Sequence, residues 1–190
     1  DAAAEAGVDH FVFSGVGSHG RNTGLPHFES AWEIDRYIQD LKLPNTILKP
    51  AFFFQNLEVM SEDILDGTLA MPLEEDVSLQ MIDIADIGRA AAEAIDTPDR
   101  FIGESIELAG DEKTLAEMAD AFAEVIGRPV EALHVPIEQA REQMGDEMTD
   151  MFEWFNRVGY TADLDSLANR FSFALTRLEE YLKIAGWSDR

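Results

Sequence analysis

The sequence contains no cysteine, which excludes disulfide bonds and thiolate chemistry. Its four histidines (His10, His19, His27 and His134) are scattered and lack the spacing of a metal site. No apolar run approaches the length of a membrane-spanning helix. A chain of 190 residues with these absences must obtain its stability from an ordinary hydrophobic core, and its length suits one domain.

Basic residues are scarce. The chain has 14 lysines and arginines and 38 aspartates and glutamates, which gives a formal net charge of −24. No basic stripe exists to meet phosphates, which argues against nucleic-acid binding. The acids are dispersed, and their mutual repulsion would be screened at molar salt. This pattern indicates a halophilic protein, the alternative being an ordinary acidic cytosolic one. We expect a cytoplasmic protein that binds neither nucleic acid nor membrane.

Strand and helix patterns alternate along the chain, which predicts an α/β fold with a mainly parallel sheet. The segments VDHFVFSG and TILKP predict short strands, and HFESAWEIDRYIQDLKL, after a loop over residues 16–26, predicts an amphipathic helix. Asp83 is expected to cap an alanine-rich helix, and Thr114 and Glu117 to form a capping box. Helices are predicted over about 136–145, 147–158 and 174–186. No internal repeat or linker divides residues 1–190.

Residues Gly15 to Gly20 match the dinucleotide fingerprint G-x-G-x-x-G and follow a predicted strand. Two features contradict that interpretation. Gly20 is followed by RNTGLP and not by a helix, and the next strand ends at Lys49-Pro50 without an acidic residue. We therefore predict a flexible loop with no pyrophosphate role. Its place after a strand still puts it at the sheet edge where α/β proteins bind ligands.

Six segments resemble, in order, successive blocks of the NmrA-like proteins, which belong to the atypical short-chain dehydrogenase/reductase superfamily. They are AGVDHFVFSG, PHFESAWEIDRYI, TILKPAFFFQN, QMIDIADIGRAAAEAI, IGESIELAGDEKTLAEMADAFAEVIGRPV and FEWFNRVGYTADLDSL. The resemblance implies a Rossmann-like domain that binds NAD or NADP, with a small mixed C-terminal lobe mainly within 52–80 and 104–175. It also implies that the chain begins near the fifth strand, so that it is N-terminally incomplete and the phosphate loop lies upstream.

The same resemblance implies a set of dinucleotide-binding residues. Ser14 and Gly15 would lie on the nicotinamide side, the segment after the next strand would follow the nicotinamide and ribose, and Asn56 would hold that segment. The residues of the segment are Pro50, Ala51, Phe52, Phe53 and Phe54. Three consecutive phenylalanines cannot all face one way, so at least one should face the cleft or the lobe; the alternative is that they are core.

His27 is a candidate cofactor-binding residue, and also a candidate proton donor or substrate contact, because it lies at the start of the predicted helix and near the expected cleft. The alternative is a solvated histidine that caps the helix. Glu29, Glu33 and Asp35 are expected to form a solvated helix face.

Ala31 stands where many relatives have lysine in HF-x-x-K. No Tyr-x-x-x-Lys pair exists in the chain either, so the Tyr–Lys chemistry of the superfamily is not expected and no catalytic residue is assigned. Cofactor affinity should be weak or absent in this chain.

Three functions remain open. The first is an NAD(P)-binding sensor or regulator, the second an NAD(P)H-dependent reductase of quinones or similar carbonyl compounds, and the third a truncated product without cofactor function. The expected partners are a dinucleotide and, for the reductase, a small-molecule substrate. The sequence identifies no protein partner.

The net charge predicts that folding depends on salt. Raising KCl from about 0.1 M to about 3 M should increase Tm steeply, because the screening length falls from about 10 Å to below about 3 Å. Circular dichroism melts across this range measure it. A Tm that does not change with salt would contradict the halophile interpretation.

Overall fold

The computed structural model describes residues 1–190 as ten α-helices, eight β-strands and two 3-10 helices. The strands are β1 (Phe11–Ser14), β2 (Asn45–Pro50), β3 (Phe52–Phe53), β4 (Thr68–Met71), β5 (Ser78–Ile82), β6 (Ser105–Leu108), β7 (Asp111–Thr114) and β8 (Glu131–His134). The helices are α1 (Ala2–Glu5), α2 (Pro26–Asp40), α3 (Ser61–Leu65), α4 (Ile84–Asp96), α5 (Pro98–Phe101), α6 (Leu115–Ile126), α7 (Ile137–Met144), α8 (Asp146–Arg157), α9 (Leu164–Leu167) and α10 (Leu178–Ile184), with η1 (Phe54–Met60) and η2 (Trp187–Asp189). None of these helices combines the length and the apolar character needed to cross a membrane.

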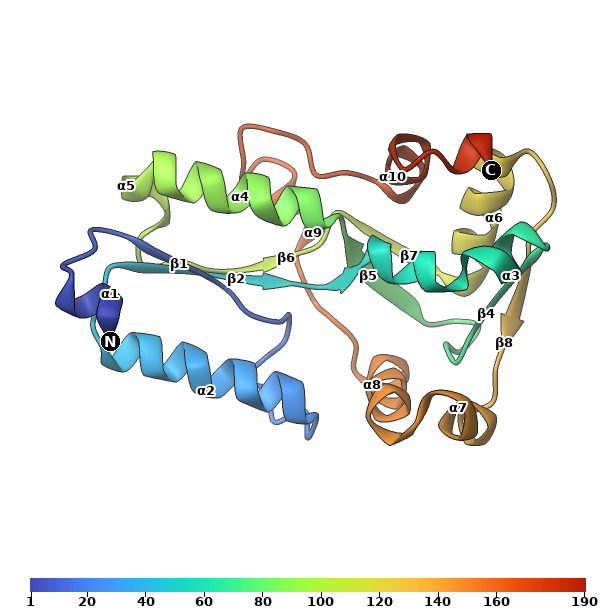
Figure 1. Ribbon diagram of the computed structural model, residues 1–190, viewed down its shortest axis with the longest axis horizontal. Coiled ribbons are helices and arrows are strands. Elements are labelled where there is room, and N and C mark those ends of the chain that lie inside the picture. The colour runs from blue at the N-terminus through green and yellow to red at the C-terminus, as the bar shows by residue number, and fades with distance from the viewer.

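One half of the molecule is a three-layer α/β sandwich. Strands β1, β2 and β6 form a parallel sheet with β2 in the centre. Helix α4 covers one face of this sheet and α2 covers the other (Figure 1). The central strand is almost fully buried, as expected for a parallel sheet with helices on both faces. A small core of ten buried residues lies under α4 and includes Leu48, Ala90 and Phe101.

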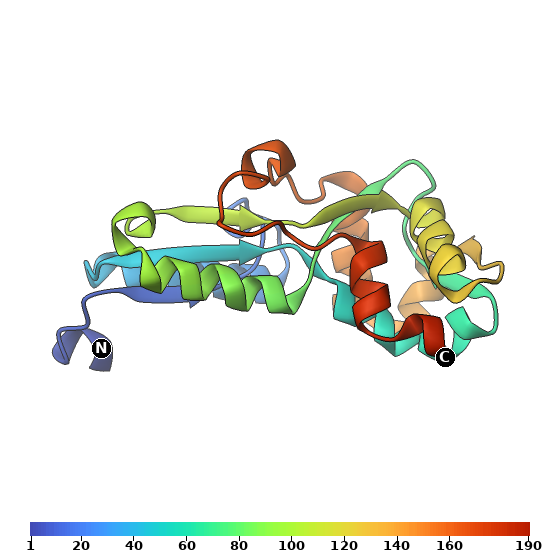
Figure 2. The same ribbon diagram turned by 90° about the horizontal axis from the view of Figure 1, so that it is seen from above.

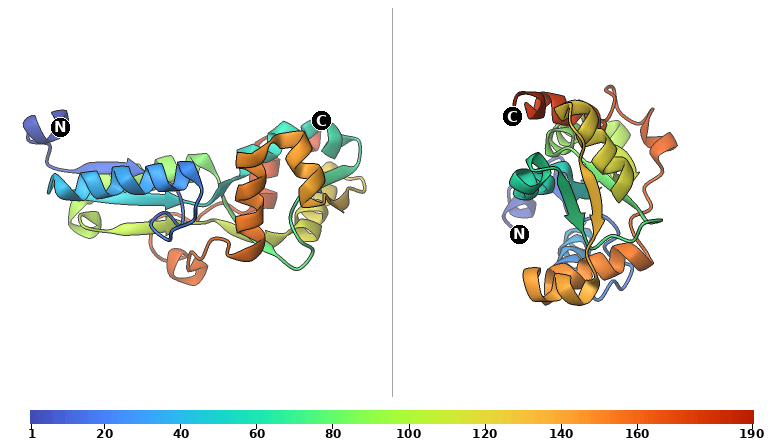
Figure 3. Two further views of the ribbon diagram at one scale, coloured as in Figure 1. Left: turned by 90° about the horizontal axis from the view of Figure 1, so that it is seen from below. Right: turned by 90° about the vertical axis from the view of Figure 1, so that its right-hand side faces the viewer.

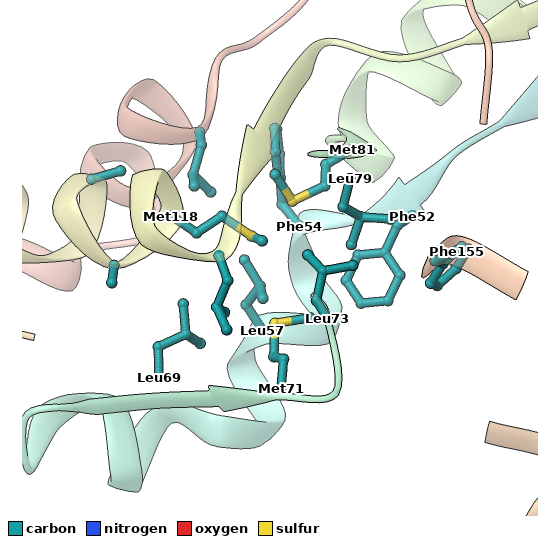
Figure 4. Close-up of a cluster of buried hydrophobic side chains, with 14 of the residues drawn as sticks. Phe52, Phe54, Leu57, Leu69, Met71, Leu73, Leu79, Met81, Met118 and Phe155 are labelled. Carbon is teal, nitrogen blue, oxygen red and sulfur yellow. The ribbon is translucent and has the colours of Figure 1, made fainter. Parts of the chain in front are cut away.

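The other half contains two smaller sheets and most of the core. Strands β3, β5 and β7 form a mixed sheet, in which β5 is parallel to β3 and antiparallel to β7, and β4 pairs with β8 in parallel. A core of 25 buried residues fills this half; Figure 4 shows part of it, with Phe52, Phe54 and Met118. The two chain ends lie at opposite ends of the elongated molecule (Figure 2).

The helix boundaries follow from capping chemistry. The Asp83 carboxylate accepts a hydrogen bond from the Ala85 N–H at 3.0 Å and begins α4. Thr114 and Glu117 form the predicted capping box of α6, and Gly127 ends that helix with φ 77°. Pro26 occupies the first turn of α2, where its missing N–H costs no hydrogen bond. The predicted caps of α4 and α6 are confirmed, whereas α2 begins at Pro26, one residue earlier than predicted, and ends at Asp40, before the predicted end.

Several elements differ from the sequence predictions. There are three short sheets and not one, and β7 was missed because its residues, DEKT, lack an apolar pattern. Strand β6 falls in the range expected for the lobe but pairs with β2. The last long helix is shorter than predicted, and α9 is an extra turn whose Leu167 packs in the core under α4.

The loop over residues 15–20 is a packed element and not the flexible loop that was predicted. The Gly17 N–H donates to the Pro50 carbonyl at 2.7 Å, which lays the loop across the end of β2. The Ser18 N–H donates to the Glu107 carboxylate at 2.9 Å. Ser18 and His19 are fully or almost fully buried. A carboxylate therefore accepts the N–H that a phosphate would need in a dinucleotide fingerprint.

The glycines of this loop are explained by close packing. A Cβ on Gly17 would lie 2.8 Å from the Tyr160 ring and 2.9 Å from the Pro50 carbonyl oxygen. A Cβ on Gly15 would lie 2.9 Å from the His19 ring. Any side chain at these positions would clash, so the match to the fingerprint arises from internal contacts.

His19 fixes the loop to helix α2. Its Nε2 lies 2.8 Å from the Asp35 carboxylate, and both side chains are buried. Asp35 is thus not part of a solvated helix face, which corrects the sequence prediction. The pair satisfies a carboxylate that would otherwise be costly to bury, and it ties together segments 16 residues apart.

The glycine packing predicts opposite effects of two Gly→Ala changes. Gly17→Ala should destabilise the fold by about 1–3 kcal/mol through overpacking, lowering Tm by roughly 3–10 °C. Gly88→Ala, in the exposed middle of α4 with no atom near its Cβ position, should stabilise by about 0.5–1 kcal/mol. Thermal melts at one salt concentration compare them. Equal Tm values for Gly17→Ala and the parent chain would contradict the packing account.

Candidate functional site

A cavity of about 510 Å³ opens where the two halves meet, at the carboxyl ends of β1 and β2. Helices α7 and α8 close it from the far side, beyond the N-terminal end of α2 (Figure 3). Nineteen residues line it, 14 of them hydrophobic. They are Gly15, Val16, His27, Phe28, Pro50, Ala51, Phe52, Phe53, Asn56, Val59, Met60, Ala70, Met71, Pro72, Met144, Met148, Met151, Phe152 and Tyr160.

Most of the residues expected to bind a dinucleotide come together in this cavity. The chain segments after β1 and β2 bring them to one sheet edge, as parallel pairing requires. Seven line the cavity: Gly15, His27, Pro50, Ala51, Phe52, Phe53 and Asn56.

Ser14 and Phe54 do not line the cavity. Ser14 is exposed at the end of β1. Phe54 is fully buried in the larger core, where its ring stacks on Tyr181 at 5.3 Å. Strand β3 ends at Phe53 and Phe54 begins the 3-10 helix η1, so the Phe54 ring leaves the cavity that Phe52 and Phe53 line. The expectation that at least one of the three faces the cavity agrees with the lining by Phe52 and Phe53.

Aromatic rings form the inner wall. Tyr160 packs against Phe28 with ring centroids 6.3 Å apart and against Phe155 at 5.3 Å. Phe52 meets Phe152 at 6.4 Å and Phe155 edge-on at 6.0 Å. Such pairs hold one another in fixed orientations, so the wall is preformed.

The mouth of the cavity is bridged by one polar contact. His27 Nδ1 on α2 lies 3.2 Å from a carboxylate oxygen of Glu147 on α8. Both side chains are partly exposed. When Nδ1 carries the hydrogen bonded to Glu147, Nε2 of the ring is left for a ligand or water.

The cavity contains no charged side chain. Its hydrogen-bonding side chains are His27, Asn56 and Tyr160. Burial, and secondarily the Glu107 carboxylate, raise the pKa of the Tyr160 phenol well above its usual value. Tyr160 therefore stays protonated at neutral pH and acts there as a neutral hydrogen-bonding group.

Ala31 lies on α2 one helical turn after His27. It is buried at 7% exposure and does not line the cavity. Side chains on a helix lean toward its N-terminus, so a longer side chain here would extend toward His27 and the cavity. Alanine is too short to do so, and it carries no hydrogen-bonding group.

Sequence reasoning missed one whole wall of the cavity. Helices α7 and α8 contribute Met144, Met148, Met151 and Phe152. The amphipathic pattern of α8 indicates a buried face but does not say what that face covers. Tyr160, close after α8, was also missed; its contact with Gly17 joins residues 143 positions apart and leaves no local signal.

The cavity fits one end of a dinucleotide. A nicotinamide ring is flat and uncharged in its reduced form, and it suits a lining of aromatic and aliphatic side chains with few polar groups. Phosphates do not fit, because no lysine or arginine lines the cavity and the Ser18 N–H of the glycine loop is already paired with Glu107. Gly15 after β1 and the residues that follow β2 are part of the lining that a nicotinamide ring could contact.

Comparison of sequences identifies the family of the chain and several relatives. A profile of the NmrA-like family matches residues 1–182. An NAD(P)H azoreductase from Xenophilus azovorans is 32% identical over 148 residues, covering 75% of this chain and 50% of that protein. An NmrA-like family domain-containing protein from Dictyostelium discoideum is 27% identical over 202 residues, covering 96% and 66%.

Two solved structures share the fold. An NADPH-dependent quinone oxidoreductase from Escherichia coli, complexed with NADPH, has a TM-score of 0.82 at 20% identity, covering 97% of this chain and 68% of that one. NmrA, a negative transcriptional regulator in complex with NADP, has a TM-score of 0.72 at 20% identity, covering 100% and 66%. At this identity the likeness establishes the α/β, Rossmann-like fold that the sequence predicts.

The chain spans about half the length of the azoreductase and about two thirds of the Dictyostelium protein. The profile match nevertheless extends over almost all of its residues and includes every residue that lines the cavity. The chain belongs to the NmrA-like family.

Proposed function

We propose that this chain forms the nicotinamide and substrate side of an NAD(P)H-dependent reductase of small aromatic or quinone-like molecules. The observation that carries the proposal is the preformed apolar cavity of about 510 Å³ at the carboxyl edge of the parallel sheet. A sensor needs space only for the dinucleotide. This cavity has room for a ligand beside a nicotinamide ring, within the size range of small-molecule sites.

The chain's own residues would position and shield the reaction. The Pro50–Phe53 segment and Gly15 would form the surface against which the nicotinamide ring lies, and Phe28, Phe52 and Tyr160 would hold a flat substrate. NAD(P)H, when bound, supplies the hydride. The Tyr160 hydroxyl is the group that could donate a hydrogen bond to a substrate oxygen, and His27 Nε2, with the Nδ1 hydrogen held by Glu147, could accept one from a substrate or water. The likeness to an NAD(P)H azoreductase at 32% identity supports this assignment.

A sensor or regulator is the second candidate, and one observation favours it. Ala31 replaces the lysine of the family pattern, so the ribose-side cation is missing, and no Tyr-x-x-x-Lys pair takes its place. A protein of this kind would bind the dinucleotide without consuming it. NADPH oxidation in molar KCl with a panel of quinones distinguishes the two: turnover supports the reductase, and binding without turnover supports the sensor.

A comparison of two reduced cofactors tests which half of the dinucleotide this chain holds. The contacts proposed for this chain reach only the nicotinamide side of the dinucleotide. Residues 1–190 should therefore bind NADPH and reduced nicotinamide mononucleotide weakly, with affinities within about threefold of each other. Calorimetry in molar KCl measures both. Micromolar NADPH affinity, or a preference for NADPH above about tenfold, would show a phosphate or adenine site within these residues.

Ala31→Lys should restore the ribose-side cation. A hydrogen bond from a charged donor contributes about 1.5–3 kcal/mol, and desolvation of the ammonium offsets part of it, so we expect about tenfold tighter binding of the reduced mononucleotide. Ala31→Met is the matched control, with a long apolar stem and no charge. Unchanged affinity in a folded Ala31→Lys protein, or an equal gain in Ala31→Met, would contradict the assignment of this position.

A further inference from the structure

We propose that the cavity selects uncharged flat aromatic molecules and excludes those that carry a sulfonate or carboxylate. This inference names the substrate class of the site and so rests on the proposed function. It follows from three features that the family assignment does not contain: an uncharged lining, methionines at the opening, and the ion pairs that compensate the charge of Arg141 on α7.

The lining offers no partner to an anion. None of the 19 residues is lysine or arginine, and the nearby loop N–H of Ser18 donates to Glu107. An anionic group drawn into this cavity would lose its hydration without gaining an ion pair, which is strongly unfavourable. An uncharged ring of the same shape loses nothing comparable.

The surroundings of the mouth add negative charge. Helices α7 and α8 together carry six acidic residues and two arginines between 137 and 157. One of those arginines, Arg141, is held by three carboxylates at 2.7–3.0 Å, those of Asp146, Asp150 and Glu153. Its charge is therefore compensated. At the mouth itself Glu147 accepts the hydrogen bond of His27 through one oxygen, and its carboxylate is exposed to solvent.

Methionine gives the cavity its tolerance for different rings. Five of the seven methionines of the chain line it, namely Met60, Met71, Met144, Met148 and Met151. Their flexible, polarisable side chains adapt to aromatic faces of different outline. Met144 and Met148 are 38% and 44% exposed, so they lie where the cavity meets solvent and a ligand enters. Selection at this mouth is thus by charge and flatness and not by a unique hydrogen-bond pattern.

Two fluorescent probes with the same rings test the proposal. N-phenylnaphthylamine is uncharged, and anilinonaphthalene sulfonate adds one sulfonate. Titrations are made without dinucleotide in at least about 1 M KCl, where charges beyond about 3 Å are screened. The uncharged probe should bind at least about a hundredfold more tightly than the sulfonate. Equal affinities, or no binding of the uncharged probe to the folded protein, would overturn the proposal.

A charge added at the mouth sharpens the test. Met148→Lys should increase the affinity for the sulfonate by about three- to tenfold and leave that for the uncharged probe nearly unchanged. Ile184→Lys is the matched control, since it adds the same charge on α10, at a position 71% exposed and outside the cavity. Met144→Lys serves if Met148→Lys does not fold. An equal gain in Ile184→Lys would show that net charge and not the cavity governs binding.

The outcome is separable from that of the proposed function. The probes report on the cavity alone, so failure of dinucleotide binding leaves this test intact. Conversely, a cavity that accepts the sulfonate would not disprove a nicotinamide site. Displacement of the sulfonate by the uncharged probe in Met148→Lys shows that both occupy one site; absence of displacement would overturn the assignment to the cavity.

Discussion

The hydrogen bond from the Gly17 N–H to the Pro50 carbonyl, at 2.7 Å, is the contact on which the site depends. It brings the loop after β1 across the end of β2 and exposes the bare Cα of Gly17 to the Tyr160 ring. Tyr160 in turn orients Phe28 and Phe155. The buried His19–Asp35 pair holds the far end of the same loop on α2. One wall of the cavity is therefore fixed before any ligand arrives, which reduces the ordering cost of binding.

The charged side chains lie outside this uncharged cavity. Of the many carboxylates, those that are buried each have partners. Asp86 accepts from Thr176 N–H at 2.6 Å and pairs with Arg89, and Asp111 accepts from Leu178 N–H at 3.0 Å and pairs with Arg177. These two contacts fasten the C-terminal segment across both halves. The remaining acids lie outside, where salt can screen them, so the net charge and an apolar cavity coexist.

The sequence was sufficient to predict features that depend on contacts between residues close together in the chain. The cap at Asp83 and the box at Thr114 were predicted correctly because a side chain and an N–H two or three residues apart determine them. Proximity of the β1 and β2 ends followed from parallel pairing. The predictions that failed concern contacts between residues distant in sequence. Asp35 is buried in its contact with His19, and β7 is a strand because it pairs with β5. No pattern within α7 and α8 indicates that these helices line the cavity.

Under the proposed function, Ala31 and the uncharged opening of the cavity, where Met144 and Met148 lie, both affect how the site handles negative charge. With lysine absent from α2 and no cation in the lining, the site stabilises neither a ribose-side ion pair nor an anionic substrate. Reduction of a quinone-like molecule nevertheless places negative charge on its oxygen. In this cavity the Tyr160 hydroxyl, whose raised pKa keeps its proton in place, can stabilise that charge by hydrogen bonding but cannot readily release a proton. Under the proposed function we therefore expect the proton to come through the mouth, where His27 contacts Glu147 and both side chains are partly exposed. The opening that admits an uncharged ring would then also be the route for the proton that neutralises the product.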